Sequence, residues 1–161
     1  MSLVNVSFMV LASILVLFMT PGLAFFYGGL VSKRNVVNTM LSVFVMTGVA
    51  IMLWILIGYS LSFVGDHGGV FGSFAHPFMS HLNLNTLTST HIPTSLYSLF
   101  QMMFAIITPA LFVGAVVGRI RFKFLLTFLV VWSIFIYYPM VHMVWSPSGL
   151  LAKLGTVDFA G

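Results

Sequence analysis

Four long apolar runs, separated by short polar segments, dominate the pattern of this chain. They cover approximately residues 4–31, 36–64, 95–118 and 124–144, and the run at 95–118 contains no charged residue. A helix rises about 1.5 Å per residue, so about 20 apolar residues cross the roughly 30 Å hydrocarbon core of a bilayer. We therefore predict an all-α polytopic membrane protein with four complete spans and a fifth that begins near residue 157.

The first run should be a retained span and not a cleaved leader. It is longer than the core of a secretory signal, has no basic segment before it, and contains no small-residue cleavage site. Pro21 and Pro109 fall inside the first and third runs, and proline lacks a backbone donor. We expect a kink at each proline.

Positive charges in the short loops predict the orientation of the chain. Five of the six basic residues fall in the first and third loops, namely Lys33, Arg34, Arg119, Arg121 and Lys123. Basic residues are enriched in cytoplasmic loops. The N-terminus and the long polar segment 66–93 should then lie outside, in a plasma or inner membrane.

The composition excludes most catalytic chemistry. The chain is 60% hydrophobic and 5% charged, has no cysteine and no glutamate, and has only two aspartates. Carboxylate pairs and thiols, the usual groups of acid–base and nucleophilic catalysis, are therefore scarce or absent. We expect no enzyme, no cofactor, no metal site and no nucleic-acid partner, and we attribute the positive charge to membrane orientation.

The third run presents two faces. Phe100 and Phe104 are four residues apart and share one side of a helix, with Gln101 and Thr108 as the nearest polar groups. This stripe is either lipid-facing packing or the lining of a path. Small residues spaced four apart predict a second face that another helix can approach closely: Ala110, Gly114 and Gly118.

Trp145 and Asp158 are the candidate polar features near the end of the chain. An indole at a span end is commonly an interfacial anchor, but its face also attracts a partly desolvated cation by about 0.5 to 2 kcal/mol. Asp158 stands where a carboxylate caps the positive end of a following helix. His142 near the same span end is interpreted as a hydrogen-bonded structural histidine.

Several blocks of residues resemble the ammonium transporter family (Amt/Mep/Rh) in its Amt form. Residues 18–30, FMTPGLAFFYGGL, resemble the first-span motif of that family. Further blocks follow in the family's order and spacing over all of the chain except 66–92: GYSL at 58–61, VGA at 113–115, RIRF at 119–122, YP at 138–139, HMVW at 142–145 and DFAG at 158–161.

The resemblance implies an eleven-span fold with two inverted five-span repeats, assembled as a homotrimer with a narrow pore in each subunit. Residues 1–161 would then be the N-terminal part of one transporter domain. The implied function is movement of ammonium or ammonia across the membrane, with methylammonium as an analogue and lipid around the protein.

The resemblance also implies roles for individual residues. Trp145 would help to form an external recruitment site, Phe104 would belong to the gate beneath it, and Phe100 would lie on the same face. Asp158 would support the site, with the backbone near Ala160 close to the pore mouth. Stacked phenyl rings would resist passage of a charge, because an ion in an apolar constriction loses several kcal/mol of solvation.

Two function hypotheses remain open at this point. The first is an ammonium transporter or channel subunit of which this chain is a fragment. The paired histidines of the family's pore have no counterpart in this sequence. The alternative is therefore a non-transporting membrane module, such as an ammonium sensor or a truncated assembly subunit.

Overall fold

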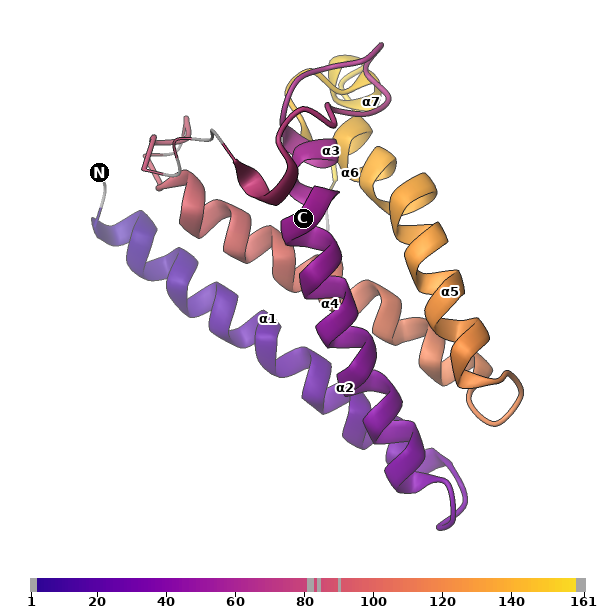
Figure 1. The fold of residues 1–161 in the computed structure, drawn as a ribbon. Coiled ribbons are helices and arrows are strands. Elements are labelled where there is room, and N and C mark those ends of the chain that lie inside the picture. The colour runs from indigo at the N-terminus through magenta and orange to yellow at the C-terminus, as the bar shows by residue number, and fades with distance from the viewer. Residues whose placement is uncertain (1–2, 81–82, 84, 90, 159–161) are drawn as a thin grey trace. The chain divides into compact units, whose positions relative to one another are not determined.

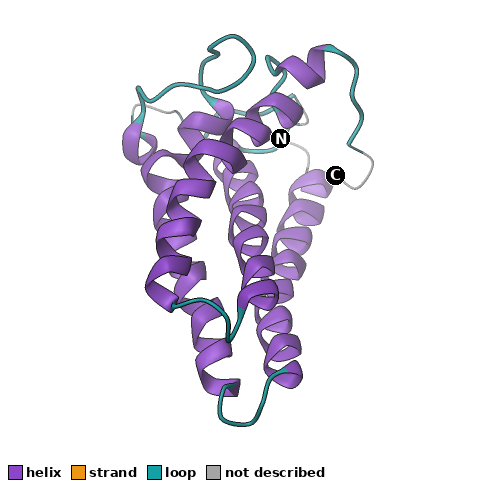
Figure 2. Ribbon diagram, turned by 90° about the vertical axis from the view of Figure 1, so that its right-hand side faces the viewer, coloured by secondary structure: helices purple, strands orange, loops and turns teal. Residues whose placement is uncertain are grey.

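The computed structural model describes residues 3–80, 83, 85–89 and 91–158, and in this part of the chain it shows helices joined by loops (Figures 1 and 2). The long elements are α1 (Leu3–Leu30), α2 (Val36–Leu53), α4 (Thr94–Val116) and α5 (Phe122–Trp132). The shorter helices are α3 (Tyr59–Phe63), α6 (Tyr138–Trp145), α7 (Leu150–Lys153) and the 3₁₀ turn η2 (Pro77–Met79). Two π-helical turns, η1 (Trp54–Gly58) and η3 (Ser133–Tyr137), join α2 to α3 and α5 to α6.

Among the described residues, four helical runs are long and apolar enough to cross a membrane, as the sequence predicts. They are Leu3–Leu30, Val36–Phe63, Thr94–Val116 and Phe122–Lys153. Pro21 and Pro109 lie inside helices that continue past them. The predicted start of a fifth span falls on residues 157–161: Val157 and Asp158 are not helical, and 159–161 lie outside the described residues.

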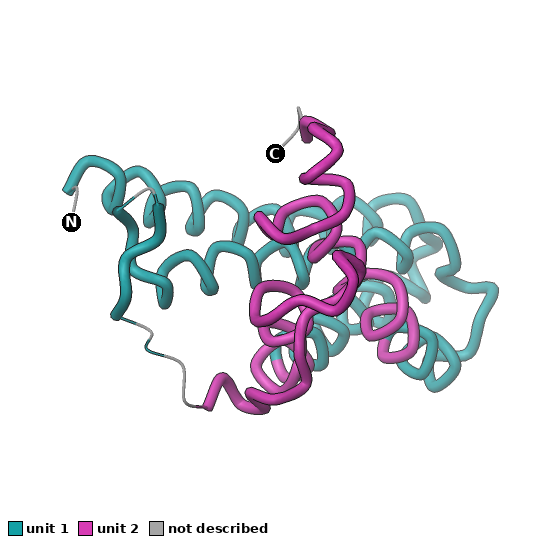
Figure 3. Tube along the Cα trace, turned by 90° about the horizontal axis from the view of Figure 1, so that it is seen from above, with its two compact units in different colours: residues 1–51, 83–129 teal, residues 52–82, 130–161 magenta. Residues whose placement is uncertain are grey.

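The chain forms two compact units, shown in different colours in Figure 3. The first contains residues 1–51 and 83–129, and the second contains residues 52–82 and 130–161. The two long helices that continue through a π-helical turn therefore contribute to both units.

In the first unit, α1 and α4 pack closely at a glycine. The backbone of Gly114 lies directly against the ring of Tyr27, where an added Cβ would overlap the ring. The Tyr27 hydroxyl donates to the carbonyl of Leu111, with 3.3 Å between the oxygens. The prediction of a close-packing face is therefore confirmed at Gly114. Gly118, predicted on the same face, instead lies beyond the end of α4 with a φ of +74°.

In the second unit, the turn η1 approaches α6 at another glycine. A Cβ on Gly58 would lie 2.7 Å from Cζ of Tyr138. The Tyr138 ring is buried and also packs on the indole of Trp54, with ring centroids 5.9 Å apart. Because the ring has neighbours on both sides, it has little room to move away from a larger residue at position 58.

The loop after α3 folds back onto that helix. The N–H of Gly72 donates to the carbonyl of Leu61 at 2.7 Å, and the N–H of Ser73 donates to the carbonyl of Val64 at 2.7 Å. The first part of this polar segment therefore packs against a span, with Asp66 and Gly69 at the C-terminal end of α3.

Substitution of Gly58 tests the close approach to Tyr138. We expect Gly58→Ala to lower the free energy of unfolding by about 1–3 kcal/mol, because overpacking a filled contact forces neighbouring atoms to shift. Thermal unfolding of the purified protein in detergent measures this change.

Gly48→Ala is the matched control, because a Cβ at Gly48 meets no atom within 4 Å. Alanine is favoured over glycine in a helix by about 1 kcal/mol, so the control should be neutral or stabilising. Equal destabilisation by the two substitutions would contradict the proposed close approach.

Candidate functional site

Trp145 and Asp158 form a hydrogen-bonded pair in the second unit. Trp145 is the last residue of α6, and its indole Nε1–H donates to Asp158 Oδ2 with 2.7 Å between the atoms. A hydrogen bond to a charged acceptor is short and about twice as strong as a neutral one. The pair therefore fixes the direction of the indole plane, and Asp158 accepts from a side chain where the sequence indicated a helix cap.

A hollow of about 230 Å³ lies beside this pair. It is lined by Tyr137, Met140, Val141, Val144, Trp145 and Asp158. Aromatic faces and a carboxylate both favour a positive charge, while the aliphatic walls exclude a large polar ligand. A small cation that keeps part of its water shell fits in a hollow of this size.

Phe100 and Phe104 form a second pair, on α4 in the first unit. Their ring centroids are 5.1 Å apart and the rings meet edge to face at 78°. The predicted shared face of these two residues is confirmed. Thr108 continues the stripe, and its hydroxyl donates to the carbonyl of Phe104 at 2.7 Å.

Gln101 is buried in the same helix and has one partner and one unused acceptor. Its Nε2 donates to the Tyr97 hydroxyl at 3.2 Å. Its Oε1 has no hydrogen-bond partner among the described residues. The polar group that the sequence placed near the phenylalanines is therefore a buried acceptor.

The structure thus assembles the predicted site residues into two pairs, one in each compact unit. The first pair combines an indole with a carboxylate, and the second consists of phenyl rings alone. Ala160 lies outside the described residues.

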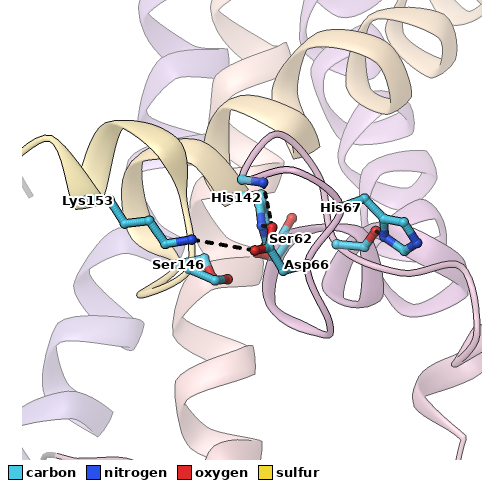
Figure 4. Close-up of polar contacts among 9 residues, drawn as sticks. Ser62, Asp66, His67, His142, Ser146 and Lys153 are labelled. Carbon is cyan, nitrogen blue, oxygen red and sulfur yellow. Dashed lines mark hydrogen bonds and ion pairs between the residues drawn. The ribbon is translucent and has the colours of Figure 1, made fainter.

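Sequence analysis missed a polar cluster that joins Asp66, His142 and Lys153 (Figure 4). His142 Nε2 lies 3.3 Å from Asp66 Oδ1, and Lys153 Nζ lies 3.6 Å from Asp66 Oδ2. His142 Nδ1 lies 3.0 Å from the carbonyl oxygen of Ser62, so the prediction of a hydrogen-bonded structural histidine is confirmed. No local pattern links residues 76 positions apart, and only tertiary packing brings them together.

The carboxyl of Asp66 is stabilised in its charged form. The N–H of Gly69 donates to Oδ1 at 2.6 Å and holds the pKa of this carboxyl below its usual value of 3.8. The contact with His142 and the charge of Lys153 also lower the pKa, against an opposing effect of desolvation. Asp66 is therefore an anion at neutral pH, with a donor or cation near each oxygen.

Comparison with known proteins adds to this geometry. Residues 7–161 match the family model described as Ammonium Transporter Family. The chain is 42% identical to a putative ammonium transporter of Methanothermobacter thermautotrophicus over 98% of this chain and 39% of the relative. It is also 42% identical to an ammonium transporter of Aquifex aeolicus over 98% of this chain and 37% of the relative.

Solved structures also resemble the chain. The crystal structure of Saccharomyces cerevisiae Mep2 superposes with a TM-score of 0.86 at 32% identity, over 99% of this chain and 37% of that protein. Candida albicans Mep2 gives a TM-score of 0.82 at 30% identity, over 98% of this chain and 34% of that protein.

The chain spans less than two fifths of the length of these relatives. Within that part, the family model matches residues 7–161, and the fold matches that of a solved relative over 99% of this chain. On this combined ground of sequence and fold, the chain belongs to the ammonium transporter family.

Proposed function

We propose that this chain is part of a membrane protein that moves ammonium or ammonia, and that Trp145 and Asp158 recruit the cation. The observation that carries this proposal is the hydrogen-bonded indole–carboxylate pair beside an aromatic and aliphatic hollow. The relatives named ammonium transporter support the substrate class. Nothing in the pair requires a cofactor.

The recruitment step follows from the chemistry of the pair. Ammonium is a small cation that can lie against an indole face, an interaction of about 0.5 to 2 kcal/mol. Asp158 orients the indole through its Nε1–H and adds a negative charge at the edge of the hollow. The family resemblance adds the backbone near Ala160 to the proposed site, close to the pore mouth.

Phe100 and Phe104 have the opposite electrostatic effect in this proposal. Two phenyl rings in edge-to-face contact offer no acceptor to replace the water around an ion. An ion at such a constriction loses solvation, whereas a neutral amine loses much less. The pair would therefore act as a barrier that favours a dehydrated or deprotonated species.

The whole protein would be a homotrimer in a plasma or inner membrane, and residues 1–161 would be the N-terminal part of one transporter domain. Large apolar side chains exposed on α1 support contact with lipid or with further protein, for example Phe8, Phe18 and Phe25. The excess of basic residues in the first and third loops supports an external N-terminus.

Two substitutions in the natural protein that contains this chain test the proposed roles. Trp145→Leu should raise the half-saturation concentration for methylammonium by about two- to thirtyfold, the equivalent of the lost cation–π energy. Phe104→Ala should increase ion current relative to amine uptake, because the apolar barrier is removed. Labelled methylammonium uptake and current across a supported membrane measure the two effects.

Phe135→Ala is the matched control for Phe104→Ala, since Phe135 is 73% exposed on η3 and belongs to neither pair. Its uptake and current should equal those of the unaltered protein. Unchanged uptake and unchanged current in both Trp145→Leu and Phe104→Ala would refute the proposed roles.

Single cysteines test the orientation, since the chain has no cysteine of its own. Asn85 and Ser32 are both exposed, in the second and first loops. We expect a membrane-impermeant maleimide to label Asn85→Cys on intact cells and Ser32→Cys only after permeabilisation. The reverse labelling would place the N-terminus inside.

A further inference from the structure

His142 connects α6 to two oxygen atoms at the end of α3 and in the loop after it. Its side chain is fully buried, and its two ring nitrogens face different acceptors: the Ser62 carbonyl lies 3.0 Å from Nδ1, and the Asp66 carboxylate lies 3.3 Å from Nε2. A ring that contacts a different partner with each nitrogen is held in one orientation.

Asp66 is the point at which three segments meet. Its Oδ1 accepts from the backbone N–H of Gly69 and faces His142 on α6, while Oδ2 faces Lys153 on α7. The carbonyl of Gly69 accepts from the N–H of Leu150 at 2.8 Å, at the start of α7. The loop after α3 is thus attached to both α6 and α7, as Figure 4 shows for the side chains.

The attached segments are the ones that carry the indole–carboxylate pair. His142 lies one turn before Trp145 on α6, and its carbonyl accepts from the N–H of Ser146 at 3.2 Å where the helix ends. The backbone of Gly149 lies directly against the carbonyls of His142 and Met143, which leaves no space there for a side chain.

Asp158, the other residue of the pair, lies shortly after the end of α7. Thr156, two residues before Asp158, donates its N–H to the carbonyl of Leu151 at 3.1 Å. The Asp66 cluster is therefore connected to Trp145 through α6, and to Asp158 through α7 and the bond between Thr156 and Leu151.

We propose that Asp66 and His142 are positioning residues for cation recruitment, which hold Trp145 and Asp158 in register by tying the loop after α3 to α6 and α7. The inference rests on the recruitment role proposed for Trp145. Lys153 has a smaller part, because its side chain is 56% exposed and exposed ion pairs contribute little.

Substitutions at the two positions test this role in the natural protein that contains this chain. Asp66→Asn preserves shape and can still accept from Gly69, but it removes the charge that faces His142. His142→Gln removes the ring whose two nitrogens contact Ser62 and Asp66. Each should raise the half-saturation concentration for methylammonium about tenfold, the equivalent of one hydrogen bond to a charged group, with the maximal uptake per correctly folded protein unchanged.

The double variant should raise the half-saturation concentration no more than either single variant does, because the two residues act through the same contact. His67→Gln is the matched control for His142→Gln, because His67 contacts its own loop: it stacks on Phe71 with ring centroids 5.2 Å apart, and its Nδ1 lies 2.8 Å from the carbonyl oxygen of Gly72. Lys153→Gln should change the half-saturation concentration less than threefold, about the effect of a surface ion pair.

A spectroscopic readout separates positioning from general destabilisation. The ¹⁹F resonance of 5-fluorotryptophan at position 145, assigned by its loss in Trp145→Phe, should shift in Asp66→Asn and in His142→Gln and stay in place in His67→Gln. An unmoved resonance together with an unchanged half-saturation concentration in either folded variant would overturn the inference. Asp66→Asn keeps the test decisive if His142→Gln fails to fold.

The proposed function can fail independently of this inference. If the unaltered protein takes up no methylammonium, the proposed function is wrong, and the Trp145 resonance alone still decides whether Asp66 and His142 position the indole. If uptake is normal and the resonance does not respond to either substitution, the positioning role is wrong and the proposed function stands.

Discussion

The need to satisfy polar groups in apolar surroundings is the constraint on which this structure depends. Without water, backbone groups must bond within their own segment, and helices achieve this. Several hydroxyls inside the helices follow the same rule by donating to the carbonyl four residues earlier, as Ser13, Ser42, Thr47 and Thr108 do. Polar side chains that instead bond across the fold, above all His142, therefore mark the places where distant segments are joined.

Helix packing in this chain relies on contact at small residues, because apolar burial alone cannot hold helices together in lipid. Gly114 against Tyr27 and Gly58 against Tyr138 are two contacts of this kind. The second lies between segments that each contain a π-helical turn, η1 and η3. A π-helical turn inserts one residue and rotates everything after it, and such turns are frequent at functional sites. Here they precede α3 with Asp66 and α6 with Trp145.

The Trp145–Asp158 pair and the Phe100–Phe104 pair differ in what the aromatic ring contacts. At Trp145 the indole N–H has a carboxylate partner, so the ring is oriented and the local potential is negative. At Phe100 and Phe104 the rings contact each other, and nothing in the pair can replace an ion's water. In the proposed function, attraction of a cation at Trp145 and exclusion of ions at Phe100 and Phe104 would be the two requirements for selecting a small amine. The positioning role proposed for the Asp66 cluster would supply the rigidity that an oriented indole needs.

Local sequence was sufficient to predict the long helices and to indicate the family. The length of each apolar run is set by the bilayer thickness, and period and spacing alone place Phe100 over Phe104 and Gly114 on a packing face. Tertiary structure alone decided the meeting of Asp66 with His142, the bond between Trp145 and Asp158, and the end of α4 before Gly118. Those contacts depend on how separate helices are rotated and joined by loops, and no short-range pattern encodes that rotation.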